Sequence, residues 1–151
     1  MGDRDTTQPA GEIAGTAPRK PLGKQRLPGG RVLLVDSIAQ VDAGDAGAWV
    51  ISGSHGGASA AAYALAQPLA LAVFNDAGVG KDDAGVAALA LLQAQGRAAA
   101  TVAHTSARIG DAHDTWAWGI VSRVNAAAAA LGLAPGQPLQ AAVTRLLGAR
   151  P

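Results

Sequence analysis

The sequence predicts a single α/β domain with a mainly parallel sheet of about four strands. Four apolar runs of strand length recur along the 151 residues, and segments with helical composition lie between them. Each run leads into polar and glycine residues. Strands that are apolar throughout are buried on both faces by helices, so we expect a small Rossmann-like three-layer sandwich.

Residues 1–30 precede this domain and lack any periodic pattern. They mix Pro, Gly and Thr with charged side chains, a composition typical of a disordered or loosely packed leader. Residues 1–31 carry six basic and three acidic side chains, but no aromatic residue stands among them. The sequence therefore predicts a basic, solvated leader over 1–30 and a folded domain over 31–151, and it disfavours nucleic-acid binding.

Four apolar runs predict the strands. They cover residues 31–35 (RVLLV), 48–52 (AWVIS), 69–75 (LALAVFN) and 98–104 (AAATVAH). Residues 37–47, between the first two runs, are too few for a full crossover helix. The first strand is therefore expected to join by an irregular connection or to run antiparallel.

Four other segments predict helices. The alanine-rich residues 58–67 follow the second strand, and residues 82–96 follow the third, with Asp82 or Asp83 as N-cap and Gly96 as the stop. Residues 114–132 read as one long helix that begins at Asp114 and ends at Gly132. Residues 137–150 carry Pro138 near their first turn and predict a closing helix.

The composition sets limits on partners and location. The chain has no Cys, which excludes disulfides and thiol chemistry. Only 15% of residues are charged, against roughly 25% in an average domain, so we expect a homo-oligomer. No stretch has the roughly 20 apolar residues of a membrane span, and we expect a cytoplasmic protein that does not contact membranes.

Polar side chains collect where the predicted strands end. Asp36 and Ser37 follow the first strand, and Ser52, Gly53, Ser54, His55, Gly56 and Gly57 close the second. Asn75, Asp76 and Lys81 follow the third strand, and His104, Thr105, Ser106 and Arg108 follow the fourth. Ligands bind outside the carboxyl ends of parallel strands. Turn and cap chemistry explains the glycines and several Asp residues, but it does not explain His55, Lys81, His104 or Arg108.

One interpretation makes Ser54 a nucleophile. The stretch SGSHG, residues 52–56, is related in pattern to the nucleophile elbow, in which small residues flank a serine on a sharp strand-to-helix turn. The amide of His55 would contribute to an oxyanion site, and Asp76 or Asp82 and then His104 would complete the order serine, acid, histidine. Ser52 departs from the usual glycine of that motif.

A second interpretation treats the glycine-rich turns after Gly57 and around Lys81 as anion cradles, supported by the positive charge of Arg108. Residues 75–82 differ from a nucleotide phosphate loop, because Asn75 replaces the first glycine and Asp82 replaces the hydroxyl residue. Residues 78–80 lack the third glycine of a dinucleotide fingerprint. We therefore expect no nucleotide cofactor.

The third interpretation is acid–base chemistry on a small carboxylate or carbonyl compound. His55 or His104 transfers the proton, an aspartate such as Asp76 tunes it, and Lys81 or Arg108 holds the negative charge. A metal site would draw on His104, Asp111 and His113, but their spacing matches no common ligand motif. We expect no metal.

The sequence therefore predicts an enzyme that acts on a small anionic metabolite, a carboxylate or a phosphate, by hydrolytic or lyase/isomerase acid–base chemistry. The alternative is a non-catalytic ligand-binding or regulatory module. The predicted catalytic residues are Ser54, His55, Asp76 and His104. The predicted substrate-binding residues are Ser52, Gly56, Gly57, Asn75, Lys81, Ser106 and Arg108.

Overall fold

A six-stranded sheet forms the centre of the molecule. The computed structural model describes residues 23–148. The strands lie in the sheet in chain order. They are β1 (Lys24–Arg26), β2 (Val32–Val35), β3 (Trp49–His55), β4 (Leu71–Asn75), β5 (Ala99–Val102) and β6 (Val121–Val124). Strands β2 to β5 are parallel, whereas β1 and β6 pair antiparallel at the two edges.

The α/β class is confirmed, but the sheet is mixed and has two more strands than the sequence predicted. Strands β2 to β5 correspond to the four apolar runs. The first of these pairs in parallel with β3 although its connection holds only two short 3₁₀ helices, η1 (Ile38–Gln40) and η2 (Ala43–Asp45). An irregular connection is therefore sufficient for a parallel crossover here.

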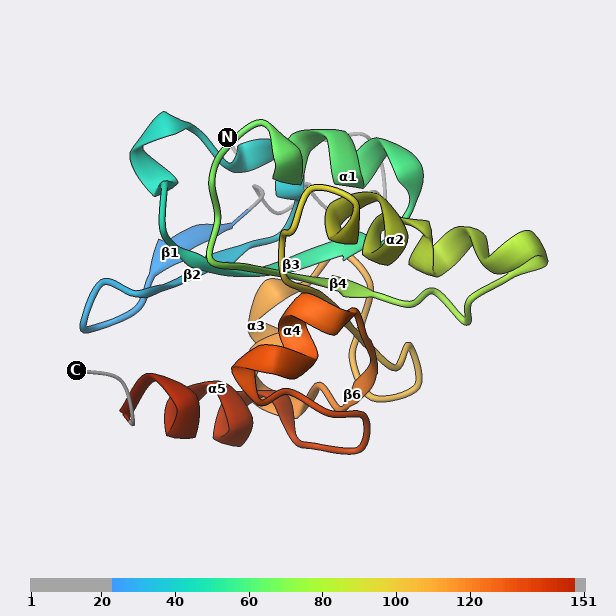
Figure 1. Ribbon diagram of the computed structural model, residues 1–151. Coiled ribbons are helices and arrows are strands. Elements are labelled where there is room, and N and C mark those ends of the chain that lie inside the picture. Colours follow the sequence, from blue (N-terminus) through green and yellow to red (C-terminus); the bar gives the residue numbers. More distant parts are fainter. Residues whose placement is uncertain (1–22, 149–151) are drawn as a thin grey trace, which may run out of the picture.

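Two layers of helices cover the sheet (Figure 1). One layer contains η1, α1 (Ala58–Leu65), the 3₁₀ helix η3 (Lys81–Val86) and α2 (Ala87–Gln93). The other contains α3 (Ala112–Trp118), α4 (Ala126–Leu131) and α5 (Leu139–Gly148). Consecutive strand residues contribute to opposite faces: Leu33 and Phe74 pack with the first layer, and Leu34 and Ile51 pack with the second. Burial on both faces explains why these strands are apolar throughout.

The segment predicted as one helix over residues 114–132 is instead a helix, a strand and a second helix. Helix α3 ends at Trp118, and the chain then runs through β6 before α4 begins. Gly119 lies so close to β5 that an added Cβ would stand 2.9 Å from Val102 Cγ1. Asn125 caps α4 by accepting the Ala128 N–H at 2.9 Å. Tertiary packing at Gly119 and this internal cap override the helical pattern.

Part of the predicted leader is ordered. Residues 24–26 form the edge strand β1, and the Gly23 N–H donates to Asp36 Oδ2 at 2.6 Å. Lys24 and Arg26 form ion pairs with the buried Asp45 at 3.0 and 2.6 Å. The sheet therefore begins before residue 31, because β2 supplies a pairing edge for β1 and Asp45 supplies a buried charge. Residues 1–22 lie outside the described part.

Candidate functional site

The carboxyl ends of β2 to β5 lie along one edge of the sheet and carry the polar residues. Val35 at the end of β2 pairs with Ser52, so β3 extends three residues further, to His55. The register between β3 and β4 then shifts, and His55 stands opposite Asn75. Ser54 and His55 therefore project past the end of β2, and His55 lies next to the strand that ends in Asn75 and Asp76.

Asp76 and His104 meet at this edge. His104 Nδ1 lies 3.3 Å from Asp76 Oδ1, and the same oxygen accepts the backbone N–H of His104 at 3.1 Å and that of Gly78 at 2.8 Å. The Asp76 side chain is 9% exposed, whereas that of His104 is 51% exposed. A buried carboxylate thus orients an imidazole whose other face reaches solvent.

The environment of Asp76 favours its ionised form. Burial alone would raise the pKa of this carboxyl. The N–H of Gly78, the hydroxyl of Ser122 and both donors of His104 outweigh that effect, and the pKa of Asp76 is lowered from its ordinary value. The carboxylate therefore accepts hydrogen bonds at neutral pH and donates none.

The loop after Asp76 folds back on itself. Its amides are already used: the Ala77 N–H donates to Asn75 Oδ1, the Gly78 N–H to Asp76 Oδ1, the Val79 N–H to Asp76 O and the Gly80 N–H to Gly78 O. Ala77 and Val79 adopt positive φ angles of 52° and 68°. Because these N–H groups have partners within the loop, they leave no cradle for an anion there.

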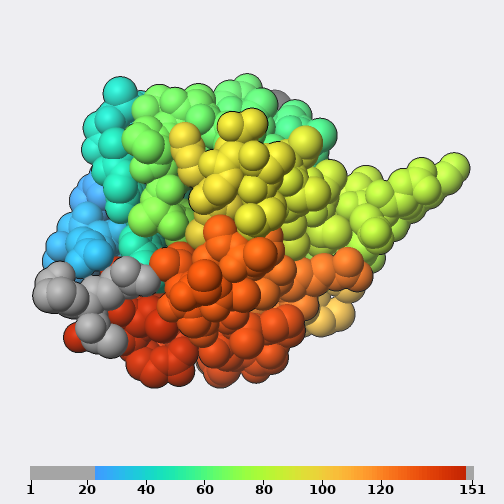
Figure 2. Space-filling view, in the orientation of Figure 1, coloured from blue at the N-terminus to red at the C-terminus, as the bar shows by residue number. Residues whose placement is uncertain are grey.

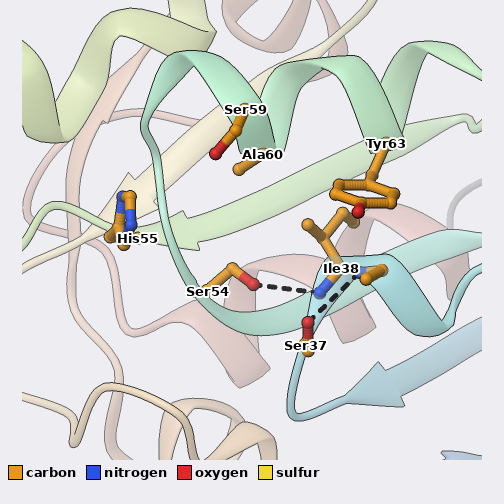
Figure 3. A pocket seen from close by; sticks show the side chains of 8 residues that line it. Ser37, Ile38, Ser54, His55, Ser59, Ala60 and Tyr63 are labelled. Atoms are coloured by element: carbon orange, nitrogen blue, oxygen red, sulfur yellow. Dashed lines mark hydrogen bonds between the residues drawn. The ribbon is translucent and has the colours of Figure 1, made fainter.

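A second polar feature, here named the seryl pocket, lies between β3, η1 and α1 (Figure 3). It is a cavity of about 140 Å³. Its lining includes Ser37, Ile38, Ser54, His55, Ser59 and Tyr63. Figure 3 shows Ser37 and Ser54 on one side and Ser59, from the first turn of α1, on the other.

The hydroxyl of Ser54 interacts with backbone. The Ile38 N–H donates to Ser54 Oγ at 2.9 Å, and no histidine of residues 23–148 lies within hydrogen-bond distance of this oxygen. Figure 3 shows the His55 ring apart from Ser54. A serine nucleophile needs a neighbouring base to take its proton. The geometry therefore gives no support to the nucleophile interpretation, which stays a prediction.

Three further predicted site residues use their side chains to hold the sheet edge together. Ser52 is buried and donates to Val73 O at 2.7 Å. Asn75 is also buried, and its Nδ2 donates to Ala107 O at 3.0 Å. Ser106 donates to Ala103 O at 2.7 Å and accepts the Ile120 N–H at 3.0 Å. These bonds fix the loops that carry Asp76 and His104.

Gly56 and Gly57 permit close packing at the end of β3. A Cβ added to Gly56 would lie 2.7 Å from Gly85 O, and one added to Gly57 would lie 2.7 Å from Cε1 of the His55 ring. Any side chain at Gly56 would push η3 away, and one at Gly57 would move the His55 ring. Both glycines therefore shape the edge through their lack of a side chain.

The two predicted cations are exposed. Lys81 begins η3 and has no side-chain partner among residues 23–148, and Figure 2 shows the lime-coloured segment near residue 80 projecting from the body. The Arg108 side chain is 79% exposed and lies 4.0 Å from Asp111 Oδ2. Neither cation lines the seryl pocket. The structure leaves both in solvent.

The predicted site therefore divides into two centres. Neighbouring strands lie about 4.8 Å apart, so β3 and β5, with β4 between them, end about 10 Å apart. Ser54 lies at the first of these ends and His104 follows the second. His55, opposite Asn75, stands between the two centres.

Four hydroxyl-bearing residues of these centres were not among the predicted site residues: Ser37, Ser59, Tyr63 and Ser122. Ser59 and Tyr63 stand four residues apart, a spacing that places both on one helix face, and this signal was available. Ser122 was assigned to a helix, and its contact with Asp76 depends on β6. No pattern in the sequence indicated that contact.

The described residues contain no group of three or more His, Cys, Asp or Glu side chains that could hold a metal ion. His113 is instead 2.7 Å from Gln25 Oε1. Residues 23–148 also contain no helix that is long and apolar enough to span a membrane.

Comparison of the chain with protein-family models, with curated proteins and with solved structures found no match. Any function must therefore be inferred from the geometry.

Proposed function

We propose that this protein is an enzyme that moves protons on a small anionic metabolite, with His104 as the acid–base group and Asp76 as the residue that orients it. The observation that carries this proposal is the 3.3 Å contact between His104 Nδ1 and the buried Asp76 carboxylate. A carboxylate that holds one ring nitrogen leaves the other nitrogen to react, as in catalytic triads.

This contact determines which nitrogen of His104 carries the proton. An ionised Asp76 only accepts, so Nδ1 of His104 carries the proton, and the lone pair of Nε2 is available to the half-exposed side of the ring. Nε2 takes a proton from a substrate C–H or O–H group, and the imidazolium that forms lies against the negative Asp76. The N–H of the imidazolium exchanges with solvent, and a proton then returns to another atom of the substrate in an isomerisation. In a lyase reaction the proton goes instead to the departing group, whose bond to the substrate breaks as the double bond forms.

This arrangement favours proton transfer over attack by Ser54. The Ser54 hydroxyl oxygen accepts the Ile38 N–H, and it lies at the end of β3, two strands from β5. A hydrolytic mechanism through Ser54 would need a base that the described residues do not place beside it. Asp76 and His104 are already in contact with each other.

The alternative is a non-catalytic binding module. The seryl pocket supports it, because a ligand could occupy that pocket without contact to His104. In this case Asp76 would serve only to hold the loops that follow β4 and β5 together through Gly78 and His104.

Exchange of substrate protons in D₂O separates the two functions. We expect the protein to catalyse deuterium incorporation into at least one compound of a panel of small carboxylates and phosphates, followed by NMR. His104→Ala should lower that rate by about 10² to 10⁴, the usual contribution of an acid–base group. Asp76→Asn should also lower the exchange rate.

The matched control is His113→Ala, which removes an exposed histidine that contacts Gln25, outside both centres. It should leave the exchange rate unchanged. Full exchange in His104→Ala would contradict the proposal. Compounds that bind tightly but exchange no proton in the wild type would establish the binding module instead.

A further inference from the structure

The seryl pocket is lined by serine hydroxyls, and two of their oxygens already accept hydrogen bonds from the backbone. The Ala39 N–H donates to Ser37 Oγ at 3.2 Å, and the Ile38 N–H donates to Ser54 Oγ at 2.9 Å. Each of these hydroxyl oxygens therefore already accepts a bond, which leaves its O–H to donate elsewhere. The Ser59 hydroxyl is exposed and has no partner among residues 23–148.

The residues that line the seryl pocket include no acid. No carboxylate lines the seryl pocket, and His55 contributes a ring that can also donate. Hydroxyl donors without a competing carboxylate match a ligand whose atoms are acceptors. A cation or an amine would find no negative partner in this lining.

The volume limits the size of the ligand. The cavity of about 140 Å³ is well below the roughly 300–1,000 Å³ of pockets that enclose whole drug-sized molecules. It corresponds to about five water molecules at roughly 30 Å³ each. The cavity therefore holds one small polar group of a ligand.

We propose that the seryl pocket binds the oxyanion group of the substrate, a phosphate or a carboxylate, through the hydroxyls of Ser37, Ser54 and Ser59. This inference rests on the proposed function for the identity of the rest of the molecule. The pocket and His104 follow β3 and β5, whose ends lie about 10 Å apart. A substrate that uses both therefore carries its anionic group several bonds from the atom that exchanges a proton, and it passes His55.

Inorganic phosphate and acetate are the probes, because they report on the pocket without any reaction. We expect either anion to raise the Tm and to shift backbone NMR signals of residues 37–39 and 58–60, relative to sodium chloride at equal ionic strength. Binding of phosphate alone or of acetate alone would support the pocket and would also identify the anionic group.

Ser59→Asp is the decisive variant. Asp in the first turn of α1 suits the helix, so this variant should fold as well as the wild type, while its charge should abolish anion binding. Ser59→Ala should weaken anion binding about tenfold, which corresponds to one hydrogen bond to a charged group. Thr144→Asp, an exposed position on α5, is the control and should bind as the wild type does.

Anion-induced shifts that persist in folded Ser59→Asp, or their absence in the wild type, would overturn the inference. Neither result affects the exchange test of His104→Ala, which depends on a different centre. Ser59→Asp is then compared on two substrates, one with the anionic group and one without it. If the variant exchanges protons only on the substrate without that group, then both centres act on one substrate.

Discussion

At the scale of single residues, Asp76 links the fold to the proposed chemistry. Its carboxylate closes the turn at Gly78 and fixes both the backbone and the ring of His104. A residue with these roles was identifiable from the sequence as an acid that directly follows a buried strand. The sequence did not identify whether His55 or His104 is its partner, because the pairing depends on which loops lie together.

The lowered pKa of Asp76 predicts how stability depends on pH. A carboxyl whose pKa is lower in the folded state than in the unfolded state stabilises the fold at pH values above its unfolded pKa, which is near 3.8. This contribution is lost as the pH falls through the folded-state pKa. Asp76→Asn should therefore lower the free energy of unfolding by about 2 kcal/mol at neutral pH. That difference should shrink below about pH 4.

Urea denaturation of both proteins between pH 2.5 and 7 measures this. Asp83→Asn is the control, because Asp83 is exposed and its φ of 57° suits Asn. A difference for Asp76→Asn that is the same at every pH would show that its charge does not stabilise the fold.

At the scale of elements, local pattern identified the strands better than the helices. The runs that became β2 to β5 are buried on both faces, so their apolar character was sufficient. The division of residues 114–132 into α3, β6 and α4 depends on Gly119 beside Val102, and this contact joins parts of the chain that are distant in sequence. The strand β1 was missed because its three residues are exposed and polar.

Ion pairs with Asp45 hold strand β1 in place. Asp45 is buried and pairs with Lys24 and Arg26. Burial opposes the ionisation of Asp45, yet the Asp42 N–H and the Lys24 ammonium outweigh it and lower its pKa. Asp45→Ala leaves two partly exposed cations and the Asp42 N–H without this partner, so we expect a loss of about 1–2 kcal/mol in stability.

Hydrogen exchange should locate that loss. Relative to the wild type, the amides of β1 in Asp45→Ala should lose more protection from exchange than those of β4. The reason is that β1 depends on these ion pairs, whereas β4 lies in the middle of the sheet. Unchanged protection of β1 would mean that pairing with β2 is sufficient to hold this edge.

At the scale of the whole molecule, the sequence predicted that polar residues would gather at one edge of the sheet, but not that they would form two centres. The division follows from strand order. Because the sheet follows the chain order, the ends that carry Ser54 and His104 are separated by β4. Strand order is set by contacts between distant segments, which periodicity and turn chemistry do not encode.

The expected homo-oligomer stays a prediction. Trp118 is 70% exposed and Tyr63 is 52% exposed, but these side chains lie on helices of opposite layers. They form no shared apolar patch that would define an interface.

The most direct test of the account is the tautomer of His104, read from long-range proton–nitrogen NMR spectra of ¹⁵N-histidine-labelled protein at pH 8.5. Orientation by an ionised Asp76 predicts that Nδ1 carries the proton and that Nε2 is free. Asp76→Asn should change this pattern, while the signals of His113 should stay as they are. A proton on Nε2 of His104 in the wild type would contradict the account, because the nitrogen proposed to accept the substrate proton would already be occupied.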